Sequence, residues 1–329
     1  MNNVPLLCIT GPTASGKSAA AYVLAQRWRT EIIVADSRQL YRGMAIGTDQ
    51  PPAAWQATVA HHLVGMAPPD DAWNAGRFCR AAEPIIARLH HDGRLPLIVG
   101  GTGLYLRALL YGLAPHPPAD AATRRRLIKR AQREGAPALH AWLAEVDPAS
   151  AAAMAPADEP KIIRALEIYL ITGRSRSAWH AEHRRGAARY DHLVVALRLP
   201  KAALHQRIER RVAEMVERGL VDEARRLWAA GHDERSPSMR GLGYRQLLRA
   251  FRGERTIDAA IAETIQETKH YAKRQMTWFR HQAEVNWIDL SGDEPAEVVA
   301  ERIDALARQR WSNCAIMPEI FPSHAAATT

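Results

Sequence analysis

Residues 11–18 read GPTASGKS and fit the phosphate-binding pattern G-x-x-x-x-G-K-[ST] without a gap. An apolar run, PLLCIT at 5–10, precedes the motif, and a segment of helical composition, KSAAAYVLAQRW at 17–28, follows it. Such a loop binds phosphate when it lies between a buried strand and the start of a helix. The motif therefore predicts a domain in which strand, loop and helix together hold a di- or triphosphate.

The rest of the chain alternates short apolar runs with helical patterns. Brief β-branched runs at 31–36, 95–101 and 192–200 are typical of strands buried in a parallel sheet, and helical patterns occupy 103–112, 201–230 and 241–281. The alternation predicts an α/β fold, a P-loop NTPase-like parallel sheet flanked by helices, with ligands at the carboxyl ends of the strands.

One stretch interrupts the alternation. Between Ala119 and Tyr190 the sequence is rich in Ala, Arg and Glu and lacks strand-like runs. We expect a mostly helical insertion at 119–190 within a core made of 1–118 and 191–312. Residues 313–329 have little periodicity, so we expect a loose tail there.

The composition limits which cellular compartment and which binding partners we expect for this chain. The formal net charge of +9 and the isoelectric point near 9.8 are compatible with a polyanionic partner. The cysteines Cys8, Cys79 and Cys314 form no C-x-x-C pair, which argues against a zinc site or a disulfide framework. Because no apolar run reaches membrane-spanning length and the N-terminus moves straight into a strand-like run, we expect a cytoplasmic protein with no membrane partner.

The phosphate loop gives the first candidate site. Backbone N–H groups of 13–18 are expected to surround a phosphate, helped by the positive end of the following helix. Lys17 supplies a point charge, and the Ser18 hydroxyl is a candidate ligand of Mg²⁺. The loop as a whole consists of Gly11, Pro12, Thr13, Ala14, Ser15, Gly16, Lys17 and Ser18.

A carboxylate is missing where an ATPase usually has one. ATPases of this type carry a second strand that ends in Asp and helps to hold the metal. The run at 95–99 instead ends in Gly100-Gly101-Thr102, whereas the run EIIVAD ends in Asp36. Asp36 is therefore expected near the phosphate, as a general base on a second substrate, as an indirect metal ligand, or simply as a cap of the loop after the strand. The pattern favours group transfer over ATP hydrolysis.

Several segments together resemble one family, the tRNA dimethylallyltransferases, from about residue 5 to residue 290. In chain order they are GPTASGKS (11–18), DSRQLYRGMAIGT (36–48), HHLV (61–64), VGGTGLYLRALLYG (99–112), IIRALEIYLITG (162–173), RGLGYRQL (240–247) and YAKRQMTWFR (271–280).

The resemblance implies transfer of a dimethylallyl group from dimethylallyl diphosphate to N6 of the adenine just 3′ of the anticodon. The loop would then hold the donor's diphosphate, with Mg²⁺ as the implied cofactor. Asp36 matches the residue expected to act as base on the adenine amine. Lys17 and Arg211 match the cations that stabilise the departing diphosphate. Thr102 matches a position near the reacting adenine.

The resemblance also implies contacts with the anticodon stem-loop of tRNA. By this comparison the RNA-binding residues are Asp36, Ser37, Arg38, Gln39, Thr102, Arg124, Pro160, Lys161, Ile162, Ile163, Arg164, Arg240, Gly241, Leu242, Gly243, Tyr244 and Arg245. Basic stretches at 124–130, 183–189 and 269–275 add positive charge. Taken alone, each arginine fits a solvated helix face better than an RNA contact, and it is their clustering that favours RNA. We expect a monomer.

Ser18 stands where Thr is commoner in the family, which preserves the hydroxyl, and this sequence departs from the family's usual pattern at four further positions. Ala45 replaces an acidic residue, Gln50 replaces a Lys, and Lys269-His270 replace Arg-Gln. His61 and His62 fit structural positions better than ligands.

Three alternatives remain at this stage. They are a P-loop kinase of small molecules or nucleotides, a prenyltransferase acting on free adenine nucleotides, and an RNA-binding protein without catalysis. The first lacks the carboxylate after 95–99, the second has no need for so many cationic surfaces, and the third leaves Lys17 and Asp36 without a purpose.

Overall fold

A computed structural model describes residues 5–183, 188–282 and 284–312. The chain forms two compact units, which we call the sheet unit (1–110 and 188–329) and the helical unit (111–187). The insertion predicted at 119–190 thus begins eight residues earlier, at Tyr111, and ends three residues earlier, at Ala187. The predicted tail at 313–329, with Cys314, lies outside the described residues.

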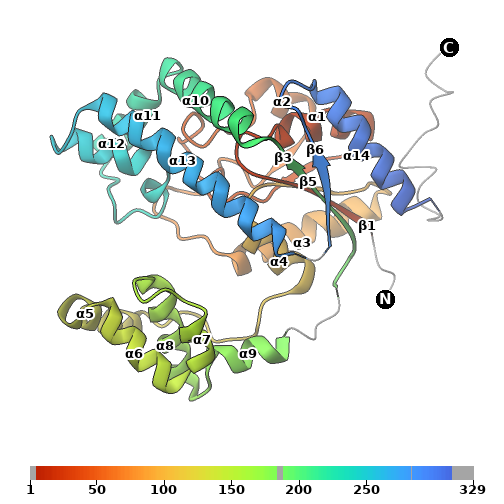
Figure 1. Ribbon diagram of the computed structural model, residues 1–329. Coiled ribbons are helices and arrows are strands. Elements are labelled where there is room, and N and C mark those ends of the chain that lie inside the picture. Colours follow the sequence, from red (N-terminus) through yellow and green to blue (C-terminus); the bar gives the residue numbers. More distant parts are fainter. Residues whose placement is uncertain (1–4, 184–187, 283, 313–329) are drawn as a thin grey trace, which may run out of the picture. The chain divides into compact units, whose positions relative to one another are not determined.

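The sheet unit is built on six parallel strands in the order β3-β2-β4-β1-β5-β6. Figure 1 labels four of them, β1, β3, β5 and β6. In chain order the strands are β1 (Pro5–Thr10), β2 (Ile32–Val34), β3 (His61–His62), β4 (Leu97–Val99), β5 (Asp191–Arg198) and β6 (Val285–Asp289). The predicted parallel α/β sheet is confirmed. The sequence did not reveal β3 and β6, because one is two residues long and the other is a half-exposed strand of mixed polarity at the opposite edge.

Helices flank this sheet. They are α1 (Lys17–Arg27), α2 (Ala53–Thr58), α3 (Ala75–His91), α4 (Gly103–Tyr111), α10 (Lys201–Glu217), α11 (Leu220–Ala229), the short 3₁₀ helix η1 (Ser238–Arg240), α12 (Tyr244–Phe251), α13 (Ile257–Arg280) and α14 (Ala296–Arg310). Alternate strand residues such as Leu7 and Ile9 join a buried cluster with α1 and α14. Trp28, just after α1, donates its indole N–H to Asp304 of α14 at 2.8 Å, which fixes these two helices to each other.

Glycines divide two segments that the sequence pattern predicted as single helical stretches. The pattern at 201–230 breaks at Gly219, whose φ of 95° is accessible to glycine at little cost, and so becomes α10 and α11. The pattern at 241–281 breaks after α12 near Gly253, whose φ is 77°, and resumes as α13 with the Thr256 side chain capping its first turn.

The helical unit confirms that the insertion is mostly helical. It contains α5 (Ala121–Glu134), α6 (Ala136–Val146), α7 (Pro148–Ala152), α8 (Glu159–Thr172) and α9 (Arg176–His183). Leu127, Leu143, Ile162 and Leu166 form part of its own buried core. In the described parts of both units, no helix is long and apolar enough to cross a membrane.

The centre of the sheet requires a very close approach of two strand ends. A Cβ on Gly100 would lie 2.1 Å from the carbonyl oxygen of Ala35, which is far shorter than any normal contact. The same carbonyl accepts the N–H of Thr102 at 3.3 Å, and Gly100 itself donates to the carbonyl of Ile9 at 3.1 Å. Only glycine lets the chain after β4 pass this closely over the chain after β2.

We therefore predict that Gly100→Ala lowers the free energy of unfolding by about 3 kcal/mol, because the clash is with backbone and no side chain can move aside. Gly253→Ala is the matched control. Nothing lies within 4 Å of its Cβ position, so only its positive φ costs energy, about 1 kcal/mol. Urea unfolding followed by tryptophan fluorescence measures both. Equal losses in the two variants would contradict the close approach.

Candidate active site

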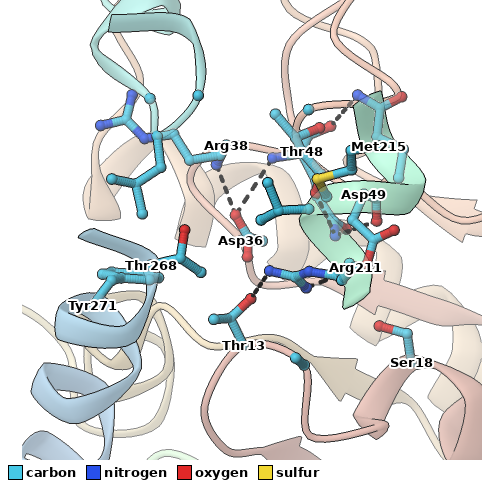
Figure 2. A pocket seen from close by; sticks show the side chains of 18 of the residues that line it. Thr13, Ser18, Asp36, Arg38, Thr48, Asp49, Arg211, Met215, Thr268 and Tyr271 are labelled. Atoms are coloured by element: carbon cyan, nitrogen blue, oxygen red, sulfur yellow. Dashed lines mark hydrogen bonds and ion pairs between the residues drawn. The ribbon is translucent and has the colours of Figure 1, made fainter. Parts of the chain in front are cut away.

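Three loops meet where neighbouring strands end. Strands β2, β4 and β1 are adjacent, so the segments that follow them, 35–39, 100–102 and 11–16, lie at the same edge of the sheet. A cavity of about 640 Å³ opens in the sheet unit at this edge. Its lining includes Lys17. Ser18, Asp36, Arg211 and Tyr271, which Figure 2 labels, also line it.

The phosphate loop adopts an unusual backbone. Gly11, Ala14 and Gly16 all have positive φ, at 137°, 63° and 91°. For Ala14 this conformation costs energy, and such strain is concentrated at ligand-binding loops. The first turn of α1 leaves its N–H groups without intrahelical partners, which favours an anion there. The geometry matches the phosphate cradle predicted from the motif.

Two of the amides expected to bind phosphate are already engaged. The N–H of Thr13 donates to Oε1 of Gln275 at 2.8 Å, and the N–H of Ser15 donates to the carbonyl of Pro12 at 3.3 Å. The prediction that every amide from 13 to 18 serves the phosphate was therefore too broad. The amides of Gly16, Lys17 and Ser18, at the start of α1, are the better candidates.

Lys17 is the basic residue of the phosphate loop itself. Its ammonium donates to the carbonyl of Pro12 at 3.3 Å. Burial lowers the pKa of Lys17 from its ordinary value to about 8, an effect opposed by the carboxylates of Asp36 and Asp49 and reinforced by Arg211. An anion bound here would restore the preference for the charged ammonium.

Arg211 reaches the same cradle from α10. Its Nη2 donates to Oγ1 of Thr13, and its Nη1 donates to the carboxylate of Asp49 at 3.3 Å (Figure 2). Its Nε is buried and has no hydrogen-bond partner within the described part of the chain. An unpartnered guanidinium donor beside a phosphate loop is a ready ligand for an anionic oxygen.

Asp36 follows β2 and faces the cavity. One carboxylate oxygen, Oδ1, accepts the N–H of Arg38 at 2.8 Å and that of Gln39 at 3.4 Å (Figure 2). The loop-capping role considered from the sequence is therefore present. No described residue forms a hydrogen bond to the other oxygen, Oδ2, so the carboxylate has an acceptor to spare for a ligand.

Thr102 lies next to this turn. Its Oγ1 accepts the N–H of Ser37 at 3.0 Å, which joins the loop after β4 to the loop after β2. Across the cavity, burial raises the pKa of Tyr271, and the nearby Asp36 carboxylate raises it further. The predicted residues Asp36, Thr102 and Lys17 thus come from the loop after β2, the loop after β4 and the start of α1, which the sheet brings together.

Both predicted RNA-binding segments of the sheet unit reach the cavity. Residues 36–39 and 240–245 line it together. Arg38 bridges them by donating to the carbonyl of Pro237 at 2.9 Å. Arg240 and Arg245 are exposed, whereas Gly241 and Gly243 are buried and Leu242 is half-buried.

Tyr244 needs a correction, because its side chain is fully buried. Its hydroxyl donates to Glu223 at 2.6 Å, and the same carboxylate accepts the N–H groups of Ile46 and Gly47 at 2.9 Å each. A Cβ on Gly47 would lie 2.5 Å from that hydroxyl. Tyr244 and Glu223 therefore shape the loop before Asp49 and leave no side-chain surface for RNA.

In the helical unit, Arg124 and Arg164 share one buried carboxylate. Both donate to Oε2 of Glu167 at 2.7 Å, and Arg164 also donates to the carbonyl of Pro117 at 2.7 Å. Arg124 remains 41% exposed, so it still presents positive charge to the solvent. Nothing in the sequence distinguishes Glu167, as a buried residue, from the other residues of its helical pattern.

The predicted stretch 160–164 is only partly available. Pro160 and Lys161 are exposed, but the side chains of Ile162 and Ile163 lie in the core of the helical unit. Their assignment as RNA contacts is therefore wrong for the side chains, since core packing already uses them. Residues 184–187 of the basic stretch 183–189 lie outside the described residues.

The residues present fit a Mg²⁺ ion held mainly by a bound diphosphate. Mg²⁺ keeps several waters and takes few protein ligands when phosphate oxygens are available. The cavity lining includes Lys17 and Ser18 as well as Asp36 and Asp49. Within the described ranges, no group of three or more His, Cys, Asp or Glu side chains could hold a metal. His61 and His62 lie in β3, where His62 contacts Glu31 at 2.6 Å.

Sequence reasoning missed two polar residues of the site. Gln275, on α13, accepts the N–H of Thr13 in the phosphate loop, and the sequence marks it only as one residue of the family segment 271–280. Asp49 has a positive φ of 54° and lies between Arg211 and Arg218, at 3.3 Å and 4.0 Å. Positive φ in a non-glycine residue marks strain that a sequence does not reveal.

Two residues that depart from the family pattern, Gln50 and Lys269, form hydrogen bonds or an ion pair within the sheet unit. Gln50 donates to the carbonyls of Gln39 at 2.9 Å and Tyr41 at 2.8 Å, and its own N–H meets the carbonyl of Ala45 at 3.0 Å. Lys269 pairs with Glu209 of α10 at 2.6 Å, which ties α13 to α10.

Known proteins are similar in sequence to this chain over most of its length. A tRNA dimethylallyltransferase of Syntrophobacter fumaroxidans is 42% identical over 289 residues, which is 88% of this chain and 84% of the relative. A tRNA dimethylallyltransferase of Bordetella parapertussis is 45% identical over 308 residues, which is 92% of this chain and 97% of the relative.

The crystal structure of a full-length tRNA isopentenylpyrophosphate transferase from Bacillus halodurans aligns with a TM-score of 0.70 at 35% identity, covering 94% of this chain and 98% of that one. The family profile described as IPP transferase matches residues 39–282. The chain therefore belongs to the IPP transferase family.

Proposed function

We propose that this protein transfers the dimethylallyl group of dimethylallyl diphosphate to N6 of the adenine just 3′ of the anticodon in tRNA. The observation that carries the proposal is the cavity itself. Its wall combines a phosphate cradle, the two cations Lys17 and Arg211, and the carboxylate of Asp36. The names of the family's relatives support this assignment.

On the donor side, the carbon–oxygen bond to the diphosphate breaks as the new carbon–nitrogen bond forms. Negative charge then grows on the leaving diphosphate, so donors aimed at it stabilise the transition state more than the ground state. The ammonium of Lys17, the orphan Nε of Arg211 and the first-turn amides of α1 are those donors. Mg²⁺ bound at Ser18 would supply further neutralising charge.

On the acceptor side, the amine of the adenine loses a proton as nitrogen bonds to carbon. Oδ2 of Asp36 takes that proton, while Oδ1 stays on the amides of Arg38 and Gln39 and keeps the carboxylate oriented. Group transfer is favoured over phosphoryl chemistry because β4 ends in Gly100-Gly101-Thr102, without the metal-binding carboxylate of an ATPase.

Each unit has its own proposed RNA-binding residues. Residues 36–39 and 240–245 line the cavity, and exposed Arg124 and Lys161 belong to the helical unit. An adenine inside a stacked loop must leave the stack to reach Asp36, at a cost of roughly a few kcal/mol.

The direct test combines the protein with Mg²⁺, dimethylallyl diphosphate and unmodified tRNA. We expect release of diphosphate that depends on RNA, together with a gain in mass at the nucleotide 3′ of the anticodon. A parallel reaction contains ATP and small acceptors, and a second one contains free adenine nucleotides. Phosphate transfer from ATP, or prenylation of free nucleotide at an equal rate, would favour the corresponding alternative.

Asp36→Asn separates the two roles of this residue. The amide oxygen still accepts from the N–H of Arg38, so the turn survives, but the side chain cannot take a proton. We predict that the chemical step slows about 10²- to 10⁴-fold with tRNA affinity nearly unchanged. Single-turnover rates and filter binding measure the two quantities. If Asp36→Asn keeps most of its activity while Asp36→Ala does not, Asp36 acts only as a cap.

The pKa of Lys17 predicts a basic limb in kcat/KM for the donor. Because this pKa is lowered to about 8, the ammonium loses its charge as pH rises through about 8, and capture of the diphosphate weakens there. The Asp49 carboxylate raises the pKa of Lys17, so Asp49→Asn moves this limb to lower pH. If the basic limb of kcat/KM lies at the same pH in Asp49→Asn as in wild type, that limb does not arise from Lys17.

A further inference from the structure

The side chain of Gln275 is buried and uses both ends of its amide. Its Oε1 accepts the N–H of Thr13 at 2.8 Å, and its Nε2 donates to the carbonyl of Gly101 at 2.9 Å. In the reverse orientation, the NH₂ group of Gln275 would face the N–H of Thr13, and its carbonyl oxygen would face the carbonyl of Gly101. Neither hydrogen bond could then form, so the two backbone partners fix the orientation of the amide. A buried amide satisfied in this way holds a single arrangement.

The two backbone partners belong to opposite sides of the reaction. Thr13 lies in the phosphate loop, and its hydroxyl accepts from Arg211. Gly101 precedes Thr102, whose hydroxyl holds the N–H of Ser37, the residue after Asp36. Gln275 therefore connects the leaving-group cradle to the loop of the proposed base through two hydrogen bonds.

The surroundings leave this bridge little freedom. A Cβ on Gly101 would lie 2.2 Å from Nε2 of Gln275, so the loop passes directly against the amide. On α13, Thr268 and Tyr271 precede Gln275 by seven and four positions and so share its face of the helix. Both line the cavity (Figure 2). One helix thus carries the bridge and part of the cavity wall.

We infer that Gln275 is a positioning residue, which sets the separation between the diphosphate cradle and Asp36. The inference rests on the proposed function. In that reaction the carbon under attack must lie about 3–3.5 Å from the amine and in line with the leaving oxygen. A shift of about 1 Å between the two sides can cost roughly 10²-fold in rate. Loss of the bridge therefore slows the chemical step more than it weakens either substrate.

The first test compares Gln275→Met with the control Gln282→Met. Gln275→Met keeps the length of the side chain and removes both polar atoms. Among the described residues, the side-chain amide of Gln282 forms a hydrogen bond only to the carbonyl of Trp278, four positions earlier on the chain. We expect kcat to fall roughly 10²-fold in Gln275→Met, with KM for the donor and for tRNA within about threefold of wild type. An unchanged kcat with a raised KM for the donor would overturn the inference.

Gln275→Glu supplies a rescue that a purely structural role would not show. When protonated, its carboxyl accepts from Thr13 and donates to Gly101, as the amide does. When ionised, it has no donor for that carbonyl. Burial raises the pKa of such a carboxyl, so the kcat of the variant relative to wild type should rise as pH falls toward about 6. A relative kcat independent of pH would contradict the bridge, and this arm decides even if Gln275→Met does not fold.

Hydrogen exchange gives a readout that needs no activity. In Gln275→Met the segments 11–18 and 100–103 should both exchange faster than in wild type, and in Gln282→Met neither should. Unchanged exchange in both segments would show that the amide does not hold them. If the wild-type protein fails to modify tRNA, the proposed function falls, while this measurement still decides whether Gln275 joins the two loops.

Discussion

The site depends on how closely the chain after β4 can pass over the chain after β2. Gly100 makes this possible, because any Cβ there would collide with the carbonyl of Ala35. Once the two segments are in contact, Thr102 reaches the N–H of Ser37 and Gly101 reaches Gln275. The positions of Asp36 and of the phosphate loop are therefore set at the centre of a parallel sheet, by the close backbone approach at Gly100 and by the side-chain hydrogen bonds of Thr102 and Gln275.

Positive and negative side chains lie close to one another around the phosphate loop. Arg211 lies between Thr13 and Asp49, and the pKa of Lys17 is lowered by burial and raised by Asp36 and Asp49. The cradle is thus cationic without being saturated by internal carboxylates, as the unpartnered Nε of Arg211 indicates. A leaving group with two phosphates would fit this pattern, since its oxygens would accept from the unpartnered Nε of Arg211 and bring further negative charge to Lys17.

The sequence predicted the parts of the site that are fixed by local rules. The phosphate loop can be recognised from its glycines and Lys17, because a defined backbone conformation requires these residue types at fixed positions. Asp36 can be recognised because it ends an apolar run. The strands β1, β2, β4 and β5 were predictable because buried strands are uniformly apolar. Edge strands such as β6 are half-exposed and carry no such pattern.

What the sequence could not reveal were long-range partners. Gln275 contacts Thr13 across 262 positions of sequence, and no periodicity encodes that pairing. The buried carboxylates Glu167 and Glu223 look like ordinary helical surface residues until packing encloses them. The same limit explains why Ile162, Ile163 and Tyr244 were assigned to RNA. A family segment marks a region, and only the fold shows which of its side chains point inward.

The most direct measurement is a structure of the protein bound to an anticodon stem-loop and to a donor analogue in which sulfur replaces the bridging oxygen. The account predicts the two phosphates within the 11–18 loop, in contact with Lys17 and Arg211. It also places the adenine N6 within about 3.2 Å of Oδ2 of Asp36, directly or through one water. Phosphates bound outside that loop, or an adenine amine out of reach of Asp36, would contradict it.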